Sequence, residues 1–105
     1  MRITLSTAVV LSGVERGYRY GFELIEATGL GAGTVYPILR RLEEGHLLVG
    51  AWEAVSVSRA EGRPPRRYYR LTAAGESMLA DAMVRYPGAS RVFTGTPASS
   101  RSQEA

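Results

Sequence analysis

Residues 34–47 read Thr34-Val35-Tyr36-Pro37-Ile38-Leu39-Arg40-Arg41-Leu42-Glu43-Glu44-Gly45-His46-Leu47 and combine an apolar repeat with a basic face. The large apolar side chains recur at positions i, i+3, i+4 and i+7, which is the spacing of one face of a helix: Val35, Ile38, Leu39 and Leu42. At 100° per residue, the opposite face carries Gly33, Pro37, Arg40 and Glu44, flanked by Tyr36 and Arg41. Small side chains and positive charge on one face indicate a helix that lies against an anionic partner.

A second basic segment follows about twenty residues later, Arg63-Pro64-Pro65-Arg66-Arg67-Tyr68-Tyr69-Arg70. Residues 59–70 hold five arginines against one acid, Glu61, which gives +4 in a chain whose net charge is +3. The remaining residues therefore sum to −1, so the positive charge is concentrated here. A recognition-type helix followed by a basic hairpin predicts a winged helix that binds double-stranded DNA.

The rest of the chain fits that order of elements. We expect helices over residues 4–16 and 22–27, the third helix from a Thr34 N-cap to Gly45, and a fourth from a Thr72 cap to Tyr86. The Thr34 cap would put Pro37 in the first turn, and Phe22, Leu24 and Ile25 should face inward. Strands are expected over 47–57 and 66–71, joined by a loop over 58–65. The predicted fold is mostly α with a small β-hairpin, a winged helix-turn-helix of order α-α-α-β-β-α.

Composition excludes several classes of protein. The chain has no cysteine and one histidine, so disulfides, thiolate catalysis and thiolate zinc sites are excluded and no cofactor is expected. The sequence holds no nucleophile–base pair, phosphate loop or close carboxylate pair, so an enzyme is not expected. The apolar run Ala8-Val9-Val10-Leu11 is too short to span a membrane, and no cleavable signal pattern opens the chain. We therefore expect a cytoplasmic protein.

Four sequence segments together resemble the PadR family of bacterial transcriptional regulators. They are Tyr20-Gly21-Phe22-Glu23-Leu24, residues 33–43, residues 62–72 and Gly75, in the family's order and spacing over residues 3–86. The resemblance implies a homodimeric repressor whose third helix enters the major groove and whose wing contacts the backbone or the minor groove. It also implies that the last helix packs against the partner's N-terminal helix. The chain resembles the short form of the family, which has no separate C-terminal helical domain.

With this resemblance, residues 1–71 are expected to form the DNA-binding domain and 72–86 a dimerisation helix. Residues 87–105 are rich in Ser, Thr, Gly and Pro, and this composition predicts a disordered tail. Many members of the family respond to small aromatic or lipophilic effectors. In the short form, any such site would lie at the dimer interface. The residues expected at that interface are Leu5, Val9, Met78, Leu79, Ala82, Met83 and Tyr86.

The residues expected to contact DNA have different roles. Thr34 and Tyr36 offer hydroxyls to phosphate, and Pro37 lies beside them at the start of the helix, where base edges are met. Arg40 is the candidate base reader because arginine pairs bidentately with guanine, whereas Arg41 is expected on phosphate. Three further arginines are assigned to the wing and are expected at the minor groove of the DNA, whose negative potential attracts arginine where the groove is narrow: Arg63, Arg66 and Arg67. Arg59 and Arg70 are expected to lie too far down the strands.

Some alternatives stay open at this stage. Arg40 and Arg41 could be a solvated helix face paired with Glu43 and Glu44, and the wing could be an exposed loop without a partner. A winged-helix module that binds an acidic protein would use the same arginines. Trp52 is interpreted as hairpin core rather than a ligand-stacking platform. Of Tyr68 and Tyr69, one should be core and the other half-exposed.

Overall fold

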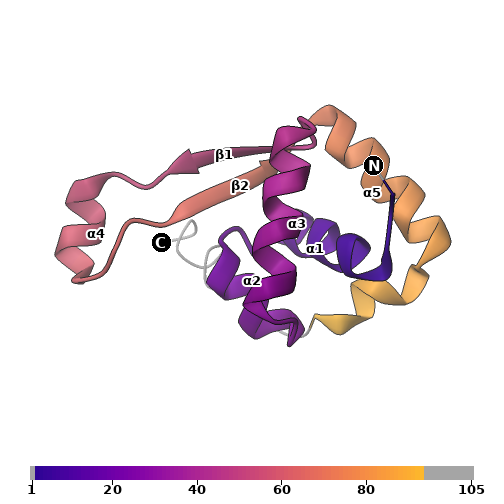
Figure 1. The fold of residues 1–105 in the computed structure, drawn as a ribbon, viewed down its shortest axis with the longest axis horizontal. Coiled ribbons are helices and arrows are strands. Elements are labelled where there is room, and N and C mark those ends of the chain that lie inside the picture. The colour runs from indigo at the N-terminus through magenta and orange to yellow at the C-terminus, as the bar shows by residue number, and fades with distance from the viewer. Residues whose placement is uncertain (1, 94–105) are drawn as a thin grey trace.

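The computed structural model describes residues 2–93 as a helical body from which a long hairpin projects (Figure 1). The elements in chain order are α1 (Leu5–Glu15), α2 (Gly21–Thr28), α3 (Ala32–Glu44), β1 (Leu48–Trp52), α4 (Val55–Glu61), β2 (Arg67–Leu71), α5 (Ala73–Arg85) and the 3-10 helix η1 (Pro87–Val92). The predicted winged helix is confirmed, with one helix more in the wing than the sequence indicated.

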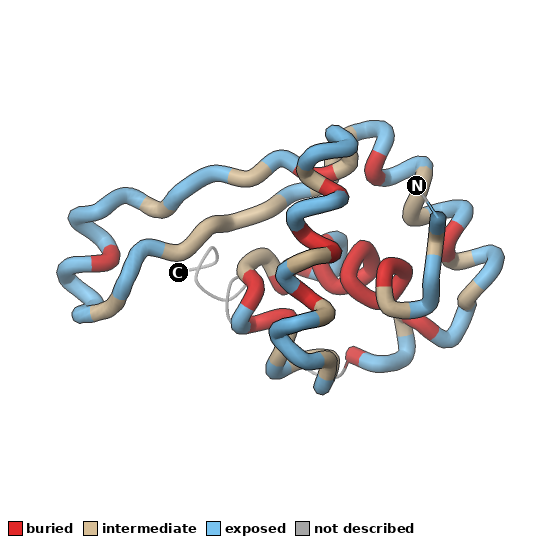
Figure 2. Tube along the Cα trace, viewed as in Figure 1, coloured by how far each residue is buried: buried red, intermediate tan, exposed pale blue. Residues whose placement is uncertain are grey.

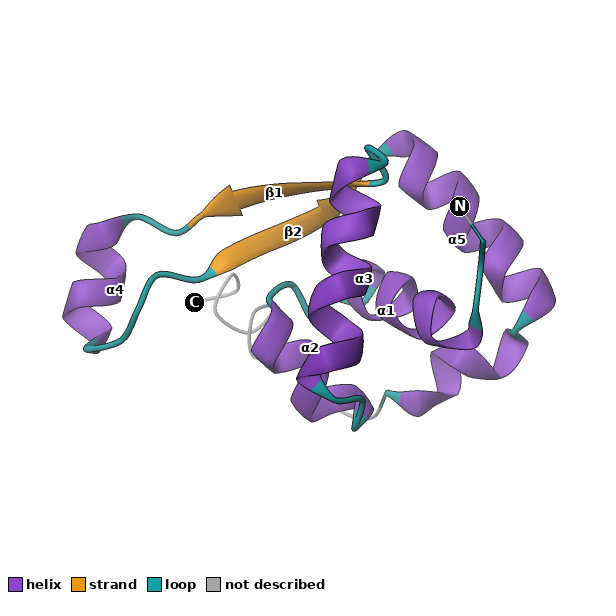
Figure 3. Ribbon diagram, in the orientation of Figure 1, coloured by secondary structure: helices purple, strands orange, loops and turns teal. Residues whose placement is uncertain are grey.

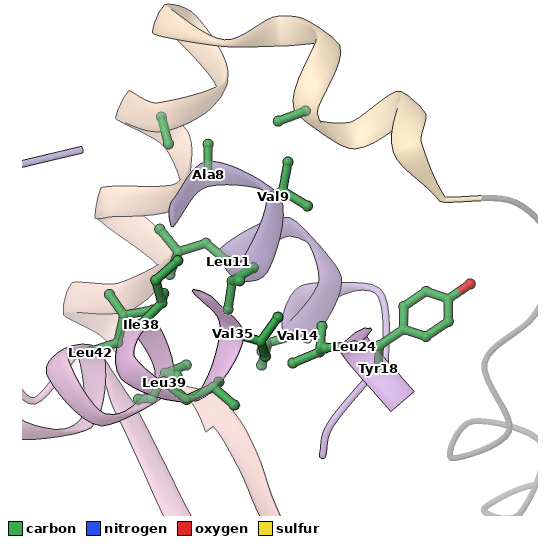
Figure 4. Close-up of a cluster of buried hydrophobic side chains, with 14 of the residues drawn as sticks. Ala8, Val9, Leu11, Val14, Tyr18, Leu24, Val35, Ile38, Leu39 and Leu42 are labelled. Atoms are coloured by element: carbon green, nitrogen blue, oxygen red, sulfur yellow. The ribbon is translucent and has the colours of Figure 1, made fainter. Parts of the chain in front are cut away.

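Helix α1 lies at the centre of the core. Every residue from 7 to 14 is buried, because α2, α3, α5, β2 and η1 all pack around this helix. Figure 2 shows the resulting continuous buried stretch, and Figure 4 shows Leu11 and Val14 meeting side chains of α2 and α3. Each fully buried aliphatic side chain here contributes about 1.5–3 kcal/mol relative to an exposed one. The all-round apolar pattern of residues 5–14 thus marks a central helix.

Helix α3 buries the four residues that the sequence repeat identified, Val35, Ile38, Leu39 and Leu42. It begins one turn earlier than expected, because the N–H groups of Thr34 and Val35 both donate to the Gly31 carbonyl at 3.0 Å. Gly31 is therefore the N-cap and the Thr34 cap was wrong. Pro37 lies in the second turn rather than the first, so its missing N–H leaves the Gly33 carbonyl without a helical donor. The C-terminal end at Gly45 is confirmed.

In helix α2, the prediction that Phe22 faces the core was wrong. Leu24 is fully buried, but Phe22 is 58% exposed and Ile25 is half-buried. The side of α2 that packs on the core carries Gly21 and Leu24, and Phe22 lies on a different side of this two-turn helix.

The wing is a two-stranded antiparallel ladder with a helix between its strands (Figure 3). Leu48 pairs with Leu71 and Trp52 with Arg67, and the Glu53 N–H still donates to the Arg66 carbonyl at 2.8 Å. The strand expected over 47–57 ends at Trp52. Helix α4, Val55–Glu61, replaces the end of that strand and the first half of the loop expected over 58–65. Gly62 has a φ of 68°, the left-handed conformation that favours glycine, and its N–H closes the last turn of α4.

Helix α5 is held to the body at its first turn. The Thr72 hydroxyl accepts from the Gly75 N–H at 3.0 Å and donates to the His46 carbonyl at 2.8 Å, which confirms Thr72 as the cap. A Cβ at Gly75 would lie 2.0 Å from the Leu47 carbonyl oxygen. Only glycine therefore permits this approach of α5 to the start of the hairpin.

The segment after α5 is ordered as far as Phe93, so the expectation of a disordered tail from residue 87 was wrong for residues 87–93. Ala89 is fully buried and Phe93 is 6% exposed. The Phe93 ring stacks on Tyr18 with centroids 5.0 Å apart, and a Cβ at Gly13 would lie 2.9 Å from its Cζ. Phe93 thus fills the space that Gly13 leaves on α1. The remainder of the predicted tail, residues 94–105, lies outside the described residues.

Candidate nucleic-acid interface

The exposed face of α3 carries the residues that the sequence assigned to DNA. Gly33, Tyr36, Arg40 and Arg41 are exposed, while Thr34 and Pro37 are half-buried. Among residues 2–93, the guanidinium groups of Arg40 and Arg41 take part in no ion pair. Their charges therefore remain available to a partner, and Tyr36 places a hydroxyl on the same face.

The Tyr36 ring is positioned by a glycine of α2. A Cβ at Gly21 would lie 2.2 Å from Cε1 of Tyr36, so the ring rests directly on the backbone of α2. The side chain is nevertheless 49% exposed. The Tyr36 ring therefore packs on α2 and still leaves part of its surface accessible.

Glu43, on the C-terminal half of α3, pairs with a wing arginine. Arg67 donates through Nε to Glu43 Oε1 at 3.3 Å and through Nη2 to Oε2. The hydrogen bond to Glu43 raises the pKa of Arg67. Gly50 permits this approach, since a Cβ there would lie 2.7 Å from Arg67 Nε. One of the two carboxylates at the end of α3 is thus neutralised, and the helix is tied to the wing.

Glu53, just after β1, organises the outer part of the wing. Arg63 donates to its two carboxylate oxygens at 2.6 and 2.9 Å, the Tyr68 hydroxyl donates at 3.2 Å, and the Arg66 N–H donates at 3.3 Å. These hydrogen bonds, above all the one from Arg63, lower the pKa of Glu53 to about 2. Sequence reasoning missed Glu53. The available signal was that it is the only acid between residues 47 and 60, opposite five arginines.

Arg66 contacts a ring instead of a carboxylate. Its guanidinium carbon lies 4.2 Å from the centroid of Tyr20, which is within cation–π range. Among the described residues, no carboxylate pairs with it. Of the three wing arginines assigned to DNA, Arg63 and Arg67 are therefore paired within the chain, and Arg66 keeps its full charge.

Helix α4 changes where the remaining basic residues lie. Arg59 was placed down a strand, but it is an exposed residue of α4 at the end of the hairpin farthest from the body (Figure 1). That placement was wrong because α4 replaces the outer part of the expected strand and loop. Arg70 is exposed on β2, close to the body.

The aromatic residues of the hairpin differ from the expectation. Trp52 is 67% exposed rather than part of the hairpin core, and Arg67 lies 5.3 Å from the centroid of its ring. Tyr68 and Tyr69 are both half-buried, so neither is fully core. Tyr69 packs against the core, and burial raises its pKa, whereas Tyr68 contacts the edge of Tyr20.

The residues expected at a dimer interface fall into two groups. Val9 and Ala82 are buried within the single chain, at 5% and 0% exposure. The others remain accessible to different degrees: Leu5 is 54% exposed, and Met78, Leu79, Met83 and Tyr86 are half-buried against the core. Val84 on α5, which the sequence analysis did not select, is 83% exposed.

Other kinds of site find no support in the described part of the chain. No group of three or more His, Asp or Glu side chains could hold a metal ion there. Among residues 2–93, no helix has both the length and the apolar character needed to cross a bilayer.

Comparisons with known proteins agree on one family. The sequence profile of the transcriptional regulator PadR-like family matches residues 10–81. The comparison with curated proteins found no match. Similar solved structures include a PadR family transcription regulator from hypervirulent Clostridium difficile, with 23% identity, a TM-score of 0.67, and coverage of 85% of this chain and 94% of that one.

Two further structures have higher sequence identity. A PadR-like transcription factor from Bacteroides fragilis is 28% identical with a TM-score of 0.62, and the match covers 77% of this chain and 79% of that one. Pex from Synechococcus is 31% identical with a TM-score of 0.60, and the corresponding shares are 81% and 83%. Fold, sequence profile and solved structures thus agree.

Proposed function

The chain belongs to the transcriptional regulator PadR-like family, and we propose that it acts as a repressor that binds a pseudo-palindromic DNA operator as a homodimer. Members of this family are transcription regulators and not enzymes. We place the action in the cytoplasm, where bacterial DNA is found. The observation that carries the proposal is the exposed face of α3, with Tyr36, Arg40 and Arg41 opposite a completely buried apolar face.

The distribution of charge supports DNA over an acidic protein. The carboxylates of Glu43 and Glu53 are each paired with an arginine, so they do not oppose a phosphate backbone. Arg40, Arg41 and Arg66 extend from α3 to the wing without a paired carboxylate among the described residues. In a helix-turn-helix protein, the N-terminal half of the recognition helix meets base edges. We therefore assign base reading to Arg40 and phosphate contacts to Tyr36, Thr34, Arg41 and Arg66.

The paired wing arginines have a different role in this proposal. Arg63 and Arg67 each donate hydrogen bonds to a carboxylate, so their net attraction for phosphate is smaller than that of Arg66. We propose that they hold the shape of the wing and touch the DNA backbone only with their remaining N–H groups.

Homodimer formation is supported by the apolar residues that a single chain leaves accessible on α1 and α5. Leu5 and Val84 are 54% and 83% exposed, beside the half-buried Met78, Leu79 and Met83. A domain of this size gains stability by covering such a surface. We propose that α5 packs against α1 of a second copy. Leu5→Glu should then give a monomer in light scattering, whereas Val55→Glu, at a valine of α4 with the same 54% exposure, should leave the dimer intact.

Selection from a random DNA pool tests the proposed function. We expect an inverted repeat with half-sites about one helical turn apart. Affinity for it should fall by roughly 10³–10⁵ between 50 and 200 mM salt if the dimer makes six to ten phosphate contacts. Enrichment of no motif, together with retention of the protein by an acidic protein partner, would instead support the interaction-module alternative.

A further inference from the structure

The turn between α1 and α2 joins the helical body to the wing. The Tyr69 N–H of β2 donates to the Arg19 carbonyl at 2.8 Å. On the other side, the Arg19 N–H donates to Glu23 Oε1 at 3.0 Å, and the Leu24 N–H donates to the Tyr20 carbonyl at 3.1 Å. Residues 19 and 20 are therefore held both by the first turn of α2 and by β2.

The ring of Tyr20 contacts two side chains of the wing. The guanidinium carbon of Arg66 lies over its face, 4.2 Å from the centroid, and the ring of Tyr68 meets it edge-on with centroids 5.6 Å apart. The Tyr68 hydroxyl and the Arg66 N–H both donate to Glu53, at 3.2 and 3.3 Å. Tyr20 is thus the residue that the helical body contributes to the Glu53 cluster.

A ring supports Arg66 in a way that a carboxylate could not. Arg63 and Arg67 are ordered by Glu53 and Glu43, but each carboxylate also compensates the charge of its arginine. An aromatic face attracts a guanidinium and carries no net charge of its own. The N–H groups of a guanidinium lie at its edge, so contact through its face leaves them available to an acceptor. Tyr20 therefore orders Arg66 and preserves its full charge.

We propose that Tyr20 is a positioning residue for DNA binding, which holds the Arg66 guanidinium ready to donate to phosphate. Ordering a long side chain before binding lowers the entropy that is lost when it docks. The next residue, Gly21, supports the ring of Tyr36 on α3. The start of α2 thus places one proposed phosphate contact on α3 and one on the wing. The role in DNA binding rests on the proposed function, whereas the placement of Arg66 by Tyr20 does not.

Nuclear magnetic resonance tests the placement of Arg66 without DNA. Because its guanidinium lies over an aromatic face, the Nε–Hε proton of Arg66 should resonate upfield of that of Arg70, which is exposed on the same strand. Arg66→Gln identifies the resonance by its absence. Tyr20→Phe should retain the upfield shift, and Tyr20→Leu should abolish it.

The matched control for this measurement is Tyr68→Phe. It removes a hydrogen bond from the same cluster but leaves the ring of Tyr20 in place, so the upfield shift of Arg66 should persist. Tyr20 is half-buried, so we expect Tyr20→Leu to fold, which circular dichroism checks; Tyr20→Met provides the same test. An unshifted Arg66 resonance in the parent chain, or a shift that survives in Tyr20→Leu, would overturn the placement.

Operator affinity tests what the placement contributes. Tyr20→Leu should weaken the selected operator at least about fivefold, because the Arg66 side chains of both protomers must then be ordered on binding. Tyr20→Phe should bind like the parent chain. When Arg66→Gln is already present, Tyr20→Leu should have no further effect, since residues that act through one contact are not additive. A general loss of wing structure would instead weaken binding in both backgrounds.

The two measurements separate the positioning role from the proposed function. Loss of the Arg66 shift in Tyr20→Leu without a loss of operator affinity would overturn the positioning role. An equal loss of affinity with and without Arg66→Gln would also overturn it. If the parent chain binds no operator, the proposed function fails, and the Arg66 resonance still decides whether Tyr20 holds that side chain.

Discussion

Glu43 on α3 and Arg67 on β2 join the two elements that a winged helix presents to DNA. Arg67 Nε lies 3.3 Å from Glu43 Oε1, and Nη2 donates to the second oxygen. The pair is about 24 residues apart in sequence, and Gly50 leaves room for it. The ion pair fixes the angle between α3 and the wing. That angle matters because both elements must fit the same stretch of duplex.

Breaking this link should weaken operator binding while leaving the fold in place. Glu43→Gln removes the charge but keeps the shape, and the more mobile wing then loses more entropy on docking. We expect affinity for the selected operator to fall by about two- to fivefold, the scale of a half-exposed ion pair. Fluorescence anisotropy measures this, with Glu44→Gln as the matched control. A gain in affinity would instead show that Glu43 acts mainly by repelling phosphate.

The Glu53 cluster should make stability depend on pH in acid. The pKa of Glu53 is lowered to about 2 from its ordinary value of 4.5, so the folded state favours the ionised carboxylate. Its contribution is therefore fully present above about pH 4.5 and is lost as pH falls through about 2. Urea unfolding of the parent chain and Glu53→Gln should differ at pH 7 and converge near pH 2. A difference that persists unchanged at pH 2 would contradict this assignment.

Gly75 should tolerate no side chain. A Cβ there would lie 2.0 Å from the Leu47 carbonyl oxygen, which is backbone and cannot turn aside. We expect Gly75→Ala to lower the free energy of unfolding by about 1–3 kcal/mol or more. In a domain of this size, each kcal/mol corresponds to about 4–8 °C in Tm. Gly88→Ala, where a Cβ meets nothing within 4 Å, should stay within about 0.5 kcal/mol of the parent chain.

Gly33 separates folding from DNA binding. It lies inside α3 on the exposed face, and a Cβ there meets nothing within 4 Å. Gly33→Ala should raise the free energy of unfolding by up to about 1 kcal/mol, because alanine is the better helix former. The same methyl group would stand between α3 and the floor of the major groove, so operator affinity should fall. A variant that is more stable and binds DNA equally well would place this face away from the duplex.

Replacing Arg40 and replacing Arg41 by alanine should affect different properties of DNA binding. Arg40→Ala is expected to relax base preference at one operator position and to cost about 1–3 kcal/mol of binding. Arg41→Ala should weaken all sequences to a similar extent and lower the salt slope by about 1. Titration of both variants against operators with single base changes distinguishes the two. Identical profiles would refute the division between base reading and phosphate contact.

The amphipathic pattern of residues 34–47 was sufficient to predict α3 and its buried face. Four large apolar residues at helical spacing leave only one way to bury them, so tertiary packing and local pattern agree. The Thr72 cap was also predicted correctly, since its hydroxyl accepts from the Gly75 N–H, whereas the Thr34 cap chosen by the same rule was wrong because Gly31 already begins α3. Elements that follow one dominant local rule were therefore placed correctly.

The wing was harder to predict because its order depends on contacts between distant residues. Val55 and Val57 favour a strand by propensity, yet they lie on α4, which the left-handed Gly62 terminates. The pairing of Glu53 with Arg63 spans ten residues, and the pairing of Glu43 with Arg67 spans 24. Trp52 was assigned to a core because tryptophan is usually buried, but a two-stranded ladder that projects from the body has no second layer to cover it.

The packing of Phe93 sets a limit on how the protein can be dissected. Composition places the end of the domain at Pro87, but the ring of Phe93 closes over Gly13 and Tyr18. A fusion junction at residue 87 would strip that ring and open α1 to water, whereas a junction after residue 93 would keep the domain whole. Fragments used for operator selection, and tags added to follow the protein in cells, should therefore be joined beyond Phe93.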